Sequence, residues 1–137
     1  MDSKSQLRKK ILEEMTVDYS NSLEKNFDLA KQFVQITKEG KVDLKEKEKF
    51  TGKDKIMLYL VGKLYAKEAG LAQTNSATNK ELMDELGMQK GSLLPWLKGL
   101  RDTNKVNQVK FGKSVQHSIQ ISNVERILLS VQKKIKV

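Results

Sequence analysis

The sequence predicts an α+β fold that is mainly α, with several helices and two short β-hairpins. Three Ser/Thr-x-x-Asp/Glu patterns precede apolar runs, and they begin at Thr51, Thr78 and Ser122. Such patterns predict helix starts, because the first side chain accepts a hydrogen bond from the helix and the acid returns one. Apolar residues also alternate on both sides of Gly40 and of Gly112, which is typical of paired strands joined by a tight turn.

Length and composition exclude several classes of protein. The 137 residues suffice for one modest core, and 38% hydrophobic against 31% charged residues leave part of the chain exposed or extended. No cysteine is present, and the single histidine, His117, is expected to be an ordinary solvent-facing or half-buried strand residue. The longest apolar run, Ile56–Val61, is too short for a membrane span, and the N-terminus lacks the apolar stretch of a secretory signal. We therefore expect a cytoplasmic protein with no metal, cofactor, small-molecule ligand or membrane partner.

Residues 1–50 are expected to form an extension ahead of the main domain. Apolar residues from Leu7 to Ala30 are spaced by threes and fours, which predicts one helix, or two that break near residues 16–20. A helix with one narrow apolar stripe cannot bury it alone, so the stripe must pack on this chain's own domain or on a second copy. The next residues favour a hairpin that turns at Gly40, although the helix could instead continue to Thr37. The charge-alternating residues 45–49 are expected to be a linker.

Residues 51–137 are expected to form the main domain, which opens with two capped helices. The first begins at Thr51, where Asp54 completes a capping box, and its wide apolar face indicates a buried helix that ends at Gly70. The second begins at Thr78, where Glu81 is expected to return the capping bond, and it ends at Gly87.

The third helix is placed by the only proline. With Ser92 as the cap, Pro95 falls in the first turn, where a missing N–H costs nothing. Asn104 is expected to end the helix in the left-handed conformation. The buried face should hold Leu93, Leu97 and Leu100.

A second hairpin and a last helix complete the predicted domain. Residues 106–111 and 115–122 alternate or are β-branched, with a glycine-containing turn between them. Ser122 and Glu125 form the third capping box ahead of an amphipathic helix. Its apolar residues are Val124, Ile127, Leu128, Val131 and Ile135.

The positive charge lies almost entirely in the last part of the chain. The net charge is +9, and residues 86–137 hold 10 basic against 2 acidic residues, a net of +8. A localised excess of this kind attracts polyanions, because each neutralised phosphate releases condensed counterions. The excess begins with the predicted third helix, which favours a nucleic acid as the partner.

Two neighbouring segments resemble a known superfamily. Residues 78–87 read TNKELMDELG and residues 90–106 read KGSLLPWLKGLRDTNKV, with a two-stranded hairpin after them. In the order helix, helix, turn, helix and wing, the chain resembles the winged helix-turn-helix superfamily, particularly its archaeal transcription-regulator-like members. The resemblance covers residues 51–122. Its best-matching positions are Glu81-Leu82, Leu86-Gly87, Gly91-Ser92-Leu93, Leu97 and Leu100.

The resemblance implies a set of DNA-contacting residues. In such proteins the third helix usually enters the major groove, and the wing meets phosphates or the minor groove. Carried over to this chain, these roles fall to Gln89, Lys90, Ser92, Trp96, Lys98 and Arg101 of the helix and to Lys110 and Lys113 of the wing. Three positions depart from the pattern. Leu94 stands where many relatives carry a polar or basic residue, Lys105 replaces a leucine, and Trp96 is either a core or a surface residue.

The function expected from these features is DNA binding by a dimeric winged-helix transcription regulator. Two alternatives remain open: a winged helix used as a protein-interaction module, and an architectural DNA-binding protein with little sequence specificity. An enzyme is not expected. The acidic pairs Glu13-Glu14 and Asp84-Glu85 point in different directions around their helices, and no phosphate-cradling glycine loop is present.

Overall fold

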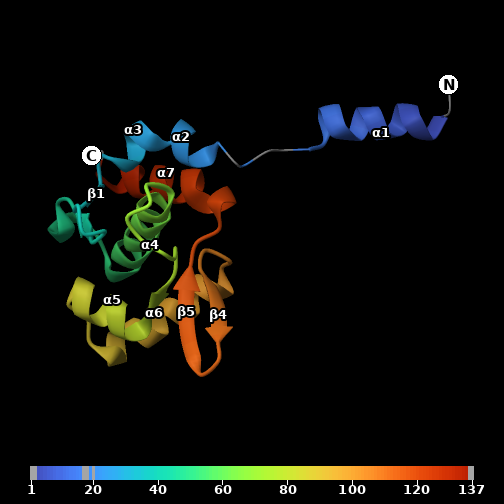
Figure 1. The fold of residues 1–137 in the computed structure, drawn as a ribbon. Helices are drawn as coiled ribbons and strands as arrows, with labels where there is room; N and C mark the ends of the chain where they lie inside the picture. The colour runs from blue at the N-terminus through green and yellow to red at the C-terminus, as the bar shows by residue number, and fades with distance from the viewer. Residues whose placement is uncertain (1–2, 17–18, 20, 136–137) are drawn as a thin grey trace.

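The computed structural model describes residues 3–16, 19 and 21–135. Residues 21–135 are arranged around one central helix, α4 (Gly52–Glu68), drawn in green in Figure 1. Toward the top and left lie α2 (Ser22–Lys25), α3 (Phe27–Ala30), β1 (Val34–Ile36), β2 (Val42–Leu44) and α7 (Val124–Ile135). Toward the bottom and right lie β3 (Ala77–Thr78), α5 (Asn79–Leu86), α6 (Lys90–Asp102), β4 (Asn107–Phe111) and β5 (Ser114–Ser118). The predicted α+β, mainly helical class is confirmed.

Helix α4 starts as predicted and forms the centre of the core. The Thr51 side chain accepts a hydrogen bond from the Asp54 backbone N–H, and the Asp54 carboxylate accepts one from the Thr51 N–H, which completes the capping box. Asp54 is buried, and its two oxygens also pair with Lys134 Nζ at 2.8 and 3.0 Å. This ion pair joins the start of α4 to the end of α7. A continuous buried run, Ile56–Leu64, fills the interior.

The β1–β2 hairpin packs directly on α4. Its antiparallel register pairs Val34 with Leu44 and Ile36 with Val42, and Gly40 takes a φ of +90°, as the turn prediction requires. Contact with α4 depends on Gly62, because a Cβ there would lie 2.4 Å from a Val42 methyl group.

The core does not divide at residue 50. The segment predicted to be a linker forms the 3₁₀ turn η1 (Lys47–Lys49), and Phe50 after it is buried against Phe33, with ring centroids 5.9 Å apart. Hairpin and α4 residues belong to one apolar cluster.

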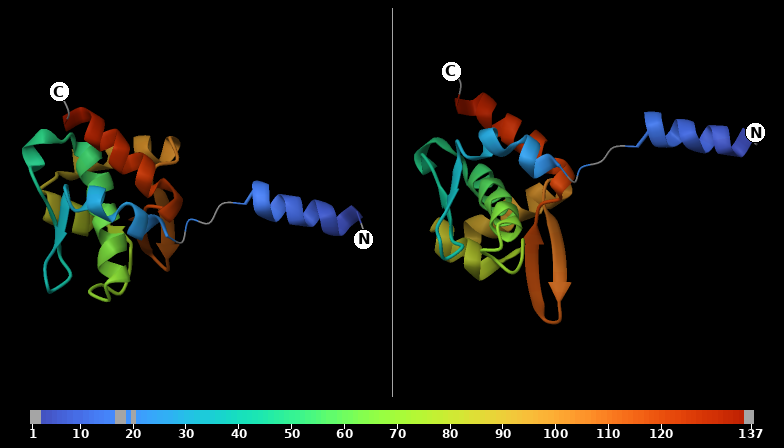
Figure 2. Two further views of the ribbon diagram at one scale, coloured as in Figure 1. Left: turned by 90° about the horizontal axis from the view of Figure 1, so that it is seen from above. Right: turned by 45° about the horizontal axis from the view of Figure 1, so that its top comes forward.

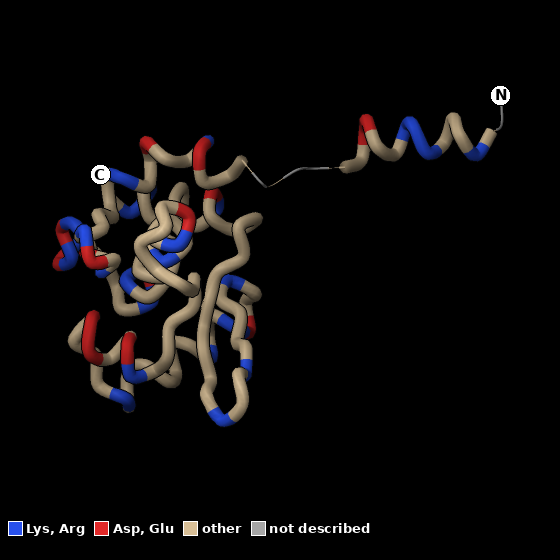
Figure 3. Tube along the Cα trace, in the orientation of Figure 1, with Lys and Arg blue, Asp and Glu red and all other residues tan. Residues whose placement is uncertain are grey.

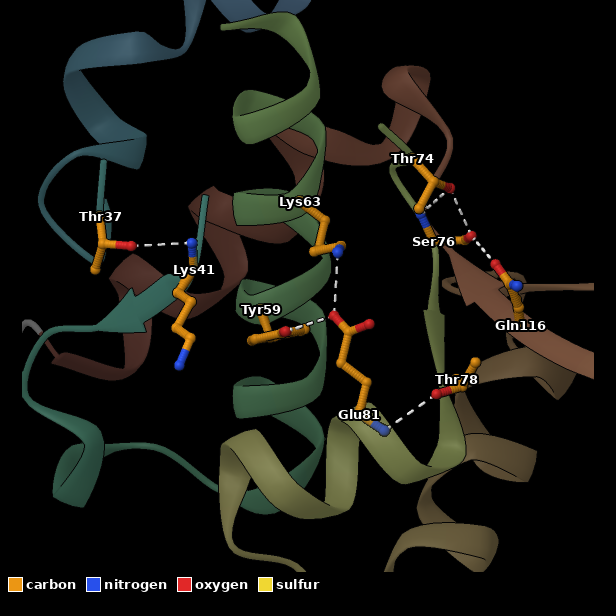
Figure 4. A network of polar contacts seen from close by, with 9 residues as sticks. All are labelled: Thr37, Lys41, Tyr59, Lys63, Thr74, Ser76, Thr78, Glu81 and Gln116. Atoms are coloured by element: carbon orange, nitrogen blue, oxygen red, sulfur yellow. Dashed lines mark hydrogen bonds and ion pairs between the residues drawn. The ribbon is translucent and has the colours of Figure 1, made fainter. Parts of the chain in front are cut away.

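One hydrogen bond predicted at the start of helix α5 is absent. The Thr78 side chain caps the helix by accepting from the Glu81 N–H at 3.1 Å, and Gly87 ends it with a φ of +64°. The Glu81 carboxylate does not return the bond. It accepts a hydrogen bond from Tyr59 at 2.5 Å and pairs with Lys63 at 3.1 Å (Figure 4). Lys63 and Tyr59 are buried on α4, and leaving either donor without an acceptor would cost more than leaving an exposed N–H at the helix end to water. The Glu81 carboxylate therefore accepts from these two side chains and links α5 to α4.

Helix α6 begins earlier than predicted. Gln89 occupies the N-cap position without a side-chain bond, so Ser92 is not the cap and Pro95 is the sixth residue of the helix rather than part of its first turn. The proline therefore removes one internal hydrogen bond, the one that the Gly91 carbonyl would accept. The predicted buried face of three leucines is confirmed, and Asn104 takes the left-handed conformation at φ +58°.

The second hairpin belongs to a three-stranded sheet. Strands β4 and β5 pair from Asn107 with Ser118 to Phe111 with Ser114, and the sheet order is β3-β5-β4. The two-residue strand β3 was not predicted. It pairs with β5 through Ala77 and His117, so the loop after α4 is partly a strand. Hydrogen bonds among Thr74, Ser76 and Gln116 hold the same edge together (Figure 4).

The last predicted capping box is wrong. Strand β5 ends at Ser118, and the 3₁₀ turn η2 (Ile121–Asn123) leads into α7, so Ser122 lies inside the turn rather than at the N-cap. Glu125 pairs instead with Lys25 of α2, at 3.3 Å. The apolar face predicted for α7 is nevertheless buried, with Ile135 partly so.

The first helix, α1 (Ser3–Glu14), stands apart from the rest. None of its residues is buried, and Figures 1 and 2 show it extending away from the body in every view. Of the two predicted alternatives, one helix or two, the structure has two: α1 ends at Glu14 and α2 begins at Ser22, with residues 17, 18 and 20 outside the described part. The predicted apolar stripe is divided in the same way. Leu23 and Ala30 are buried in this chain's own core, whereas Leu7 and Ile11 are exposed, and pairing of α1 with a second copy stays a prediction. In the described residues no helix is long and apolar enough to cross a membrane.

Candidate nucleic-acid interface

Helix α6 is fixed in rotation by its buried leucines. Leu93, Leu97 and Leu100 are at most 2% exposed and face α4 and α5. Because successive residues turn by about 100° around a helix, the exposed residues divide into two flanks. One flank carries Lys90, Leu94, Lys98 and Arg101, and the other carries Gln89, Ser92, Trp96 and Gly99. The predicted helix residues are therefore not on a single face.

The cationic flank faces the β4–β5 hairpin. His117 of β5 is buried, and its Nε2 lies 2.6 Å from Asn79 Oδ1 of α5, so this face of the sheet points toward the helices. Burial, and to a smaller extent the charge of Arg101 on α6, lower the pKa of His117, so the cationic flank acts electrostatically on this strand. Val115 and His117 are two residues apart in β5, so they lie on the same face of the sheet. Lys110 of β4 pairs with Val115 and therefore lies on that face too.

The β4–β5 hairpin holds two of the predicted site residues, Lys110 and Lys113, away from the body of the protein. It projects from the body in Figure 2, and Figure 3 shows a basic residue at its tip. Lys113 stands in the two-residue turn beside Gly112, whose φ is +62°. No acidic residue occurs between Thr103 and Val124. Five of the eight predicted site residues are thus cations on two consecutive elements, with Lys90, Lys98 and Arg101 along one flank of α6 and Lys110 and Lys113 on the hairpin.

Trp96 and Ser92 lie on the opposite flank of α6. The Trp96 ring packs on Gly52 at the start of α4, where a Cβ would come within 2.4 Å of the ring. The side chain is partly buried against the core, so Trp96 is both a core and a surface residue. Beside it lies a cavity of about 360 Å³, which Lys53, Lys105 and Lys134 help to line. Asp54 lines the same cavity and pairs with Lys134, so the net positive charge of the Trp96 flank comes from Lys53 and Lys105.

Comparison with known proteins leaves the geometry to be interpreted on its own. No family model, curated protein or solved structure matches this chain. The cationic side has the charge and shape of an anion-binding surface, and an α-helix with an adjacent β-ribbon is an arrangement that fits the grooves and backbone of duplex DNA.

One carboxylate lies within the cationic flank. Asp102 accepts a hydrogen bond from Lys98 at 2.9 Å, and this bond lowers the pKa of the Asp102 carboxyl. Both side chains are exposed, so water and salt screen the pair strongly. A phosphate can therefore replace Asp102 as the partner of Lys98 at little cost.

Three exposed apolar side chains lie on the same two elements as the cations, and the sequence prediction singled out Leu94 but missed Val109 and Phe111. Leu94 of α6 is 39% exposed, Val109 of β4 39% and Phe111 of β4 59%. Val109 and Phe111 alternate along β4 with Gln108 and Lys110, so they lie on the face of the hairpin away from His117, and their exposure shows that the described part of the chain leaves this face open. Strand alternation showed that these residues share a face, but it did not show that the face stays open.

His117 corrects a prediction. It is 1% exposed rather than solvent-facing or half-buried, and burial, with a smaller contribution from Arg101, lowers its pKa to about 4. The imidazole is neutral at pH 7, so Nε2–H donates to Asn79 and the buried Nδ1 has no hydrogen-bond partner in the described structure. His117 thus supports the sheet beneath the cations without adding to their charge.

Proposed function

We propose that this protein binds duplex DNA as a winged helix-turn-helix protein, with α6 in the major groove and the β4–β5 hairpin as the wing. The observation that supports this most is the distribution of five cations over two consecutive elements, three along one flank of α6 and two on the hairpin that follows it. Helices α5 and α6 meet at the Gly87 turn, and the hairpin follows α6 directly, which is the order that the resemblance implies. The net charge of +8 on residues 86–137 fits the same role.

The expected mode of binding is mainly electrostatic. Lys110 and Lys113 are placed for phosphates beside the groove, and Lys90, Lys98 and Arg101 lie along the flank of α6 that faces the hairpin. Direct sequence reading has fewer candidates on that flank. Arg101 can bond a guanine edge, and Leu94 can touch a thymine methyl. We therefore propose modest sequence specificity, closer to an architectural protein than to a strict operator-binding repressor.

Salt-dependent binding tests this proposal. Fluorescence anisotropy with a labelled duplex should give a log–log salt slope of about −4.5 if five phosphates are neutralised. Lys90→Ala with Arg101→Ala should weaken binding by about 10- to 100-fold and flatten the slope by about 2. Lys38→Ala with Lys67→Ala removes two exposed charges from the far hairpin turn and the end of α4, and should change little. Equal losses in both double variants, or no duplex binding at low salt, would reject the proposal.

A protein-interaction module is the second candidate, because Leu94, Val109 and Phe111 leave apolar surface beside the cations. The two candidates differ in the effect of Phe111→Ser. If the surface serves DNA, this substitution should change duplex affinity by less than about threefold, since the charges remain. Absence of duplex binding in the unsubstituted protein, together with concentration-dependent association that Phe111→Ser abolishes, would favour the protein-interaction role.

A further inference from the structure

Helix α1 has the properties of a segment that needs a partner. It is 12 residues long, and isolated helices of that length are marginal in water. Its basic residues lie toward the N-terminal end and Glu13 and Glu14 at the C-terminal end, the reverse of what the helix dipole favours. Leu7 and Ile11 are nevertheless exposed, at 59% and 39%. Leu7 and Ile11 can therefore be buried only against a surface that is not part of α1.

A coiled coil of two α1 helices does not supply enough burial. The helix spans fewer than two heptads, and its seam holds only Leu7 and Ile11 before Glu14 takes the next seam position. Paired copies of α1 alone would bring the two Glu14 carboxylates together at that position if the helices were parallel. The stripe fits a preformed groove better than it fits a copy of itself.

The body of the protein offers such a groove. Two cavities, of about 570 and 250 Å³, share Phe27, Ile36 and Tyr65 as lining residues, so they adjoin each other along α3, β1 and α4, and we call the pair the groove. Phe27 is 52% exposed although it lies on the Tyr65 ring, with centroids 6.4 Å apart. The floor is mostly apolar and no segment of the described chain covers it.

The two ends of the groove carry opposite charge. Glu24 and Glu68 line only the larger cavity, and Lys31 and Lys45 line only the smaller one. Along α1 the order is Lys4, Arg8, Lys9 and Lys10, followed by Glu13 and Glu14. A helix laid with its N-terminal end over Glu24 and Glu68 places its terminal acids over Lys31 and Lys45. Both ends of the helix are then matched in charge.

We infer that the groove holds α1 of a second copy of this chain, so that two copies exchange their N-terminal helices. Leu7 and Ile11 enter between Phe27, Ile36 and Tyr65, and the acids and bases at the two ends set the direction of the helix. Because both copies present the same helix and the same groove, the contact is made twice and closes a symmetric dimer.

The chain's own α1 meets the groove in the matched direction only if the connection runs back along the whole helix. Asn21 lines the Glu24 end, while Glu14 would have to lie at the Lys31 end. The seven steps from Glu14 to Asn21 reach at most about 24 Å and α1 is about 18 Å long, so the connection would be held at about three-quarters of its full reach, which costs conformational entropy. In the opposite direction, Arg8 and its basic neighbours would meet the two lysines.

Cysteine cross-linking tests the exchange of α1 between copies. The chain has no cysteine of its own, so every disulfide that forms joins the introduced residues. Equal amounts of the Ile11→Cys and Ile36→Cys proteins, mixed and oxidised, should form a disulfide-linked pair containing one chain of each. Lys9→Cys, on the opposite side of α1, should cross-link to Ile36→Cys less than about one-tenth as well. Self-linked Ile11→Cys chains would mean that α1 pairs with α1. Closure within a single doubly substituted chain would mean that α1 fills its own groove, and either result overturns the inference.

Sedimentation equilibrium of the full chain gives a second, independent reading. Ile11→Asp or Phe27→Asp should raise the dimer dissociation constant at least about 100-fold, whereas Leu71→Asp, exposed outside the groove, should not. Glu68→Lys should weaken the dimer about 5-fold, and Arg8→Glu in the same chain should restore it. A monomeric unsubstituted protein, or no rescue by the charge swap, overturns the inference. No DNA is present in either experiment, so this inference and the DNA-binding proposal can fail separately.

Discussion

Acidification should destabilise the protein through His117. The imidazole is buried and neutral in the folded state, with a pKa of about 4, while the unfolded chain titrates at the ordinary value of about 6.5. Because the folded pKa is the lower one, the unfolded state binds the proton first as the pH falls. Stability is therefore fully present above pH 6.5, is lost between pH 6.5 and 4, and loses no more to this residue below pH 4.

The size of the loss follows from the two pKa values. Between pH 7 and pH 5 the linkage relation gives about 2 kcal/mol, which is a large share of the total for a domain of this size. Urea unfolding followed by circular dichroism at both pH values measures it. The His117→Gln variant should be less stable at pH 7, but its free energy of unfolding should change by about 2 kcal/mol less between the two pH values.

Proton NMR checks the cause separately. The chain has one histidine, so its Cε1–H resonance is assigned without ambiguity. If that resonance titrates near pH 6.5 in the folded protein, or if the pH dependence of unfolding is the same in His117→Gln, then the buried, neutral state described for His117 is incorrect.

Three further substitutions test how α4 holds the fold. Gly52→Ala pushes a Cβ into the Trp96 ring and should cost about 1–3 kcal/mol in urea unfolding with a shift of Trp fluorescence, whereas Gly91→Ala, which meets open space, should be neutral or stabilising. Gly62→Ala drives a Cβ into two hairpin valines and should also cost about 1–3 kcal/mol, and unchanged stability would contradict the close packing of the hairpin. Glu81→Ala removes the acceptor of a buried tyrosine and the partner of a buried lysine, and should cost about 2–4 kcal/mol. A loss no larger than that of an exposed residue such as Asp84→Ala would show that this network contributes little.

Local signals in the sequence predicted much of the backbone. The left-handed positions at Gly40, Gly87 and Asn104 were predicted because each needs only its own residue type at the end of a regular segment. The capping box at Thr51 was likewise predicted from four consecutive residues. These features depend on residues that are neighbours in the sequence, so one sequence is enough to predict them.

Features that depend on distant residues were not predicted. Strand β3 has only two residues, and it forms by hydrogen bonding to β5. The Glu81 carboxylate accepts a hydrogen bond from Tyr59, 22 residues away, instead of capping its own helix. Burial of His117 has the same origin, since Asn79 of α5 receives its hydrogen bond. The α6 start at Lys90 rather than beyond Ser92 shows that tertiary packing of three leucines outweighs the poor placement of a proline.

The candidate interface was predictable in charge but not in arrangement. Counting residues located the basic excess in the last 52 positions. Helical periodicity alone separates Lys90, Lys98 and Arg101 from Ser92 and Trp96. The sequence does not say which of these flanks faces the hairpin, because that depends on how β5 packs against α5.

The ion pair between Asp54 and Lys134 makes the C-terminal end of the chain part of the fold's closure. The two residues are 80 positions apart, so their contact closes a long loop that includes α4 to α7. Removing Lys134 by exopeptidase trimming would leave a buried carboxylate without its cation at the start of the central helix. A truncation of α7 that removes Lys134 should therefore give a less stable protein rather than a harmlessly shortened one.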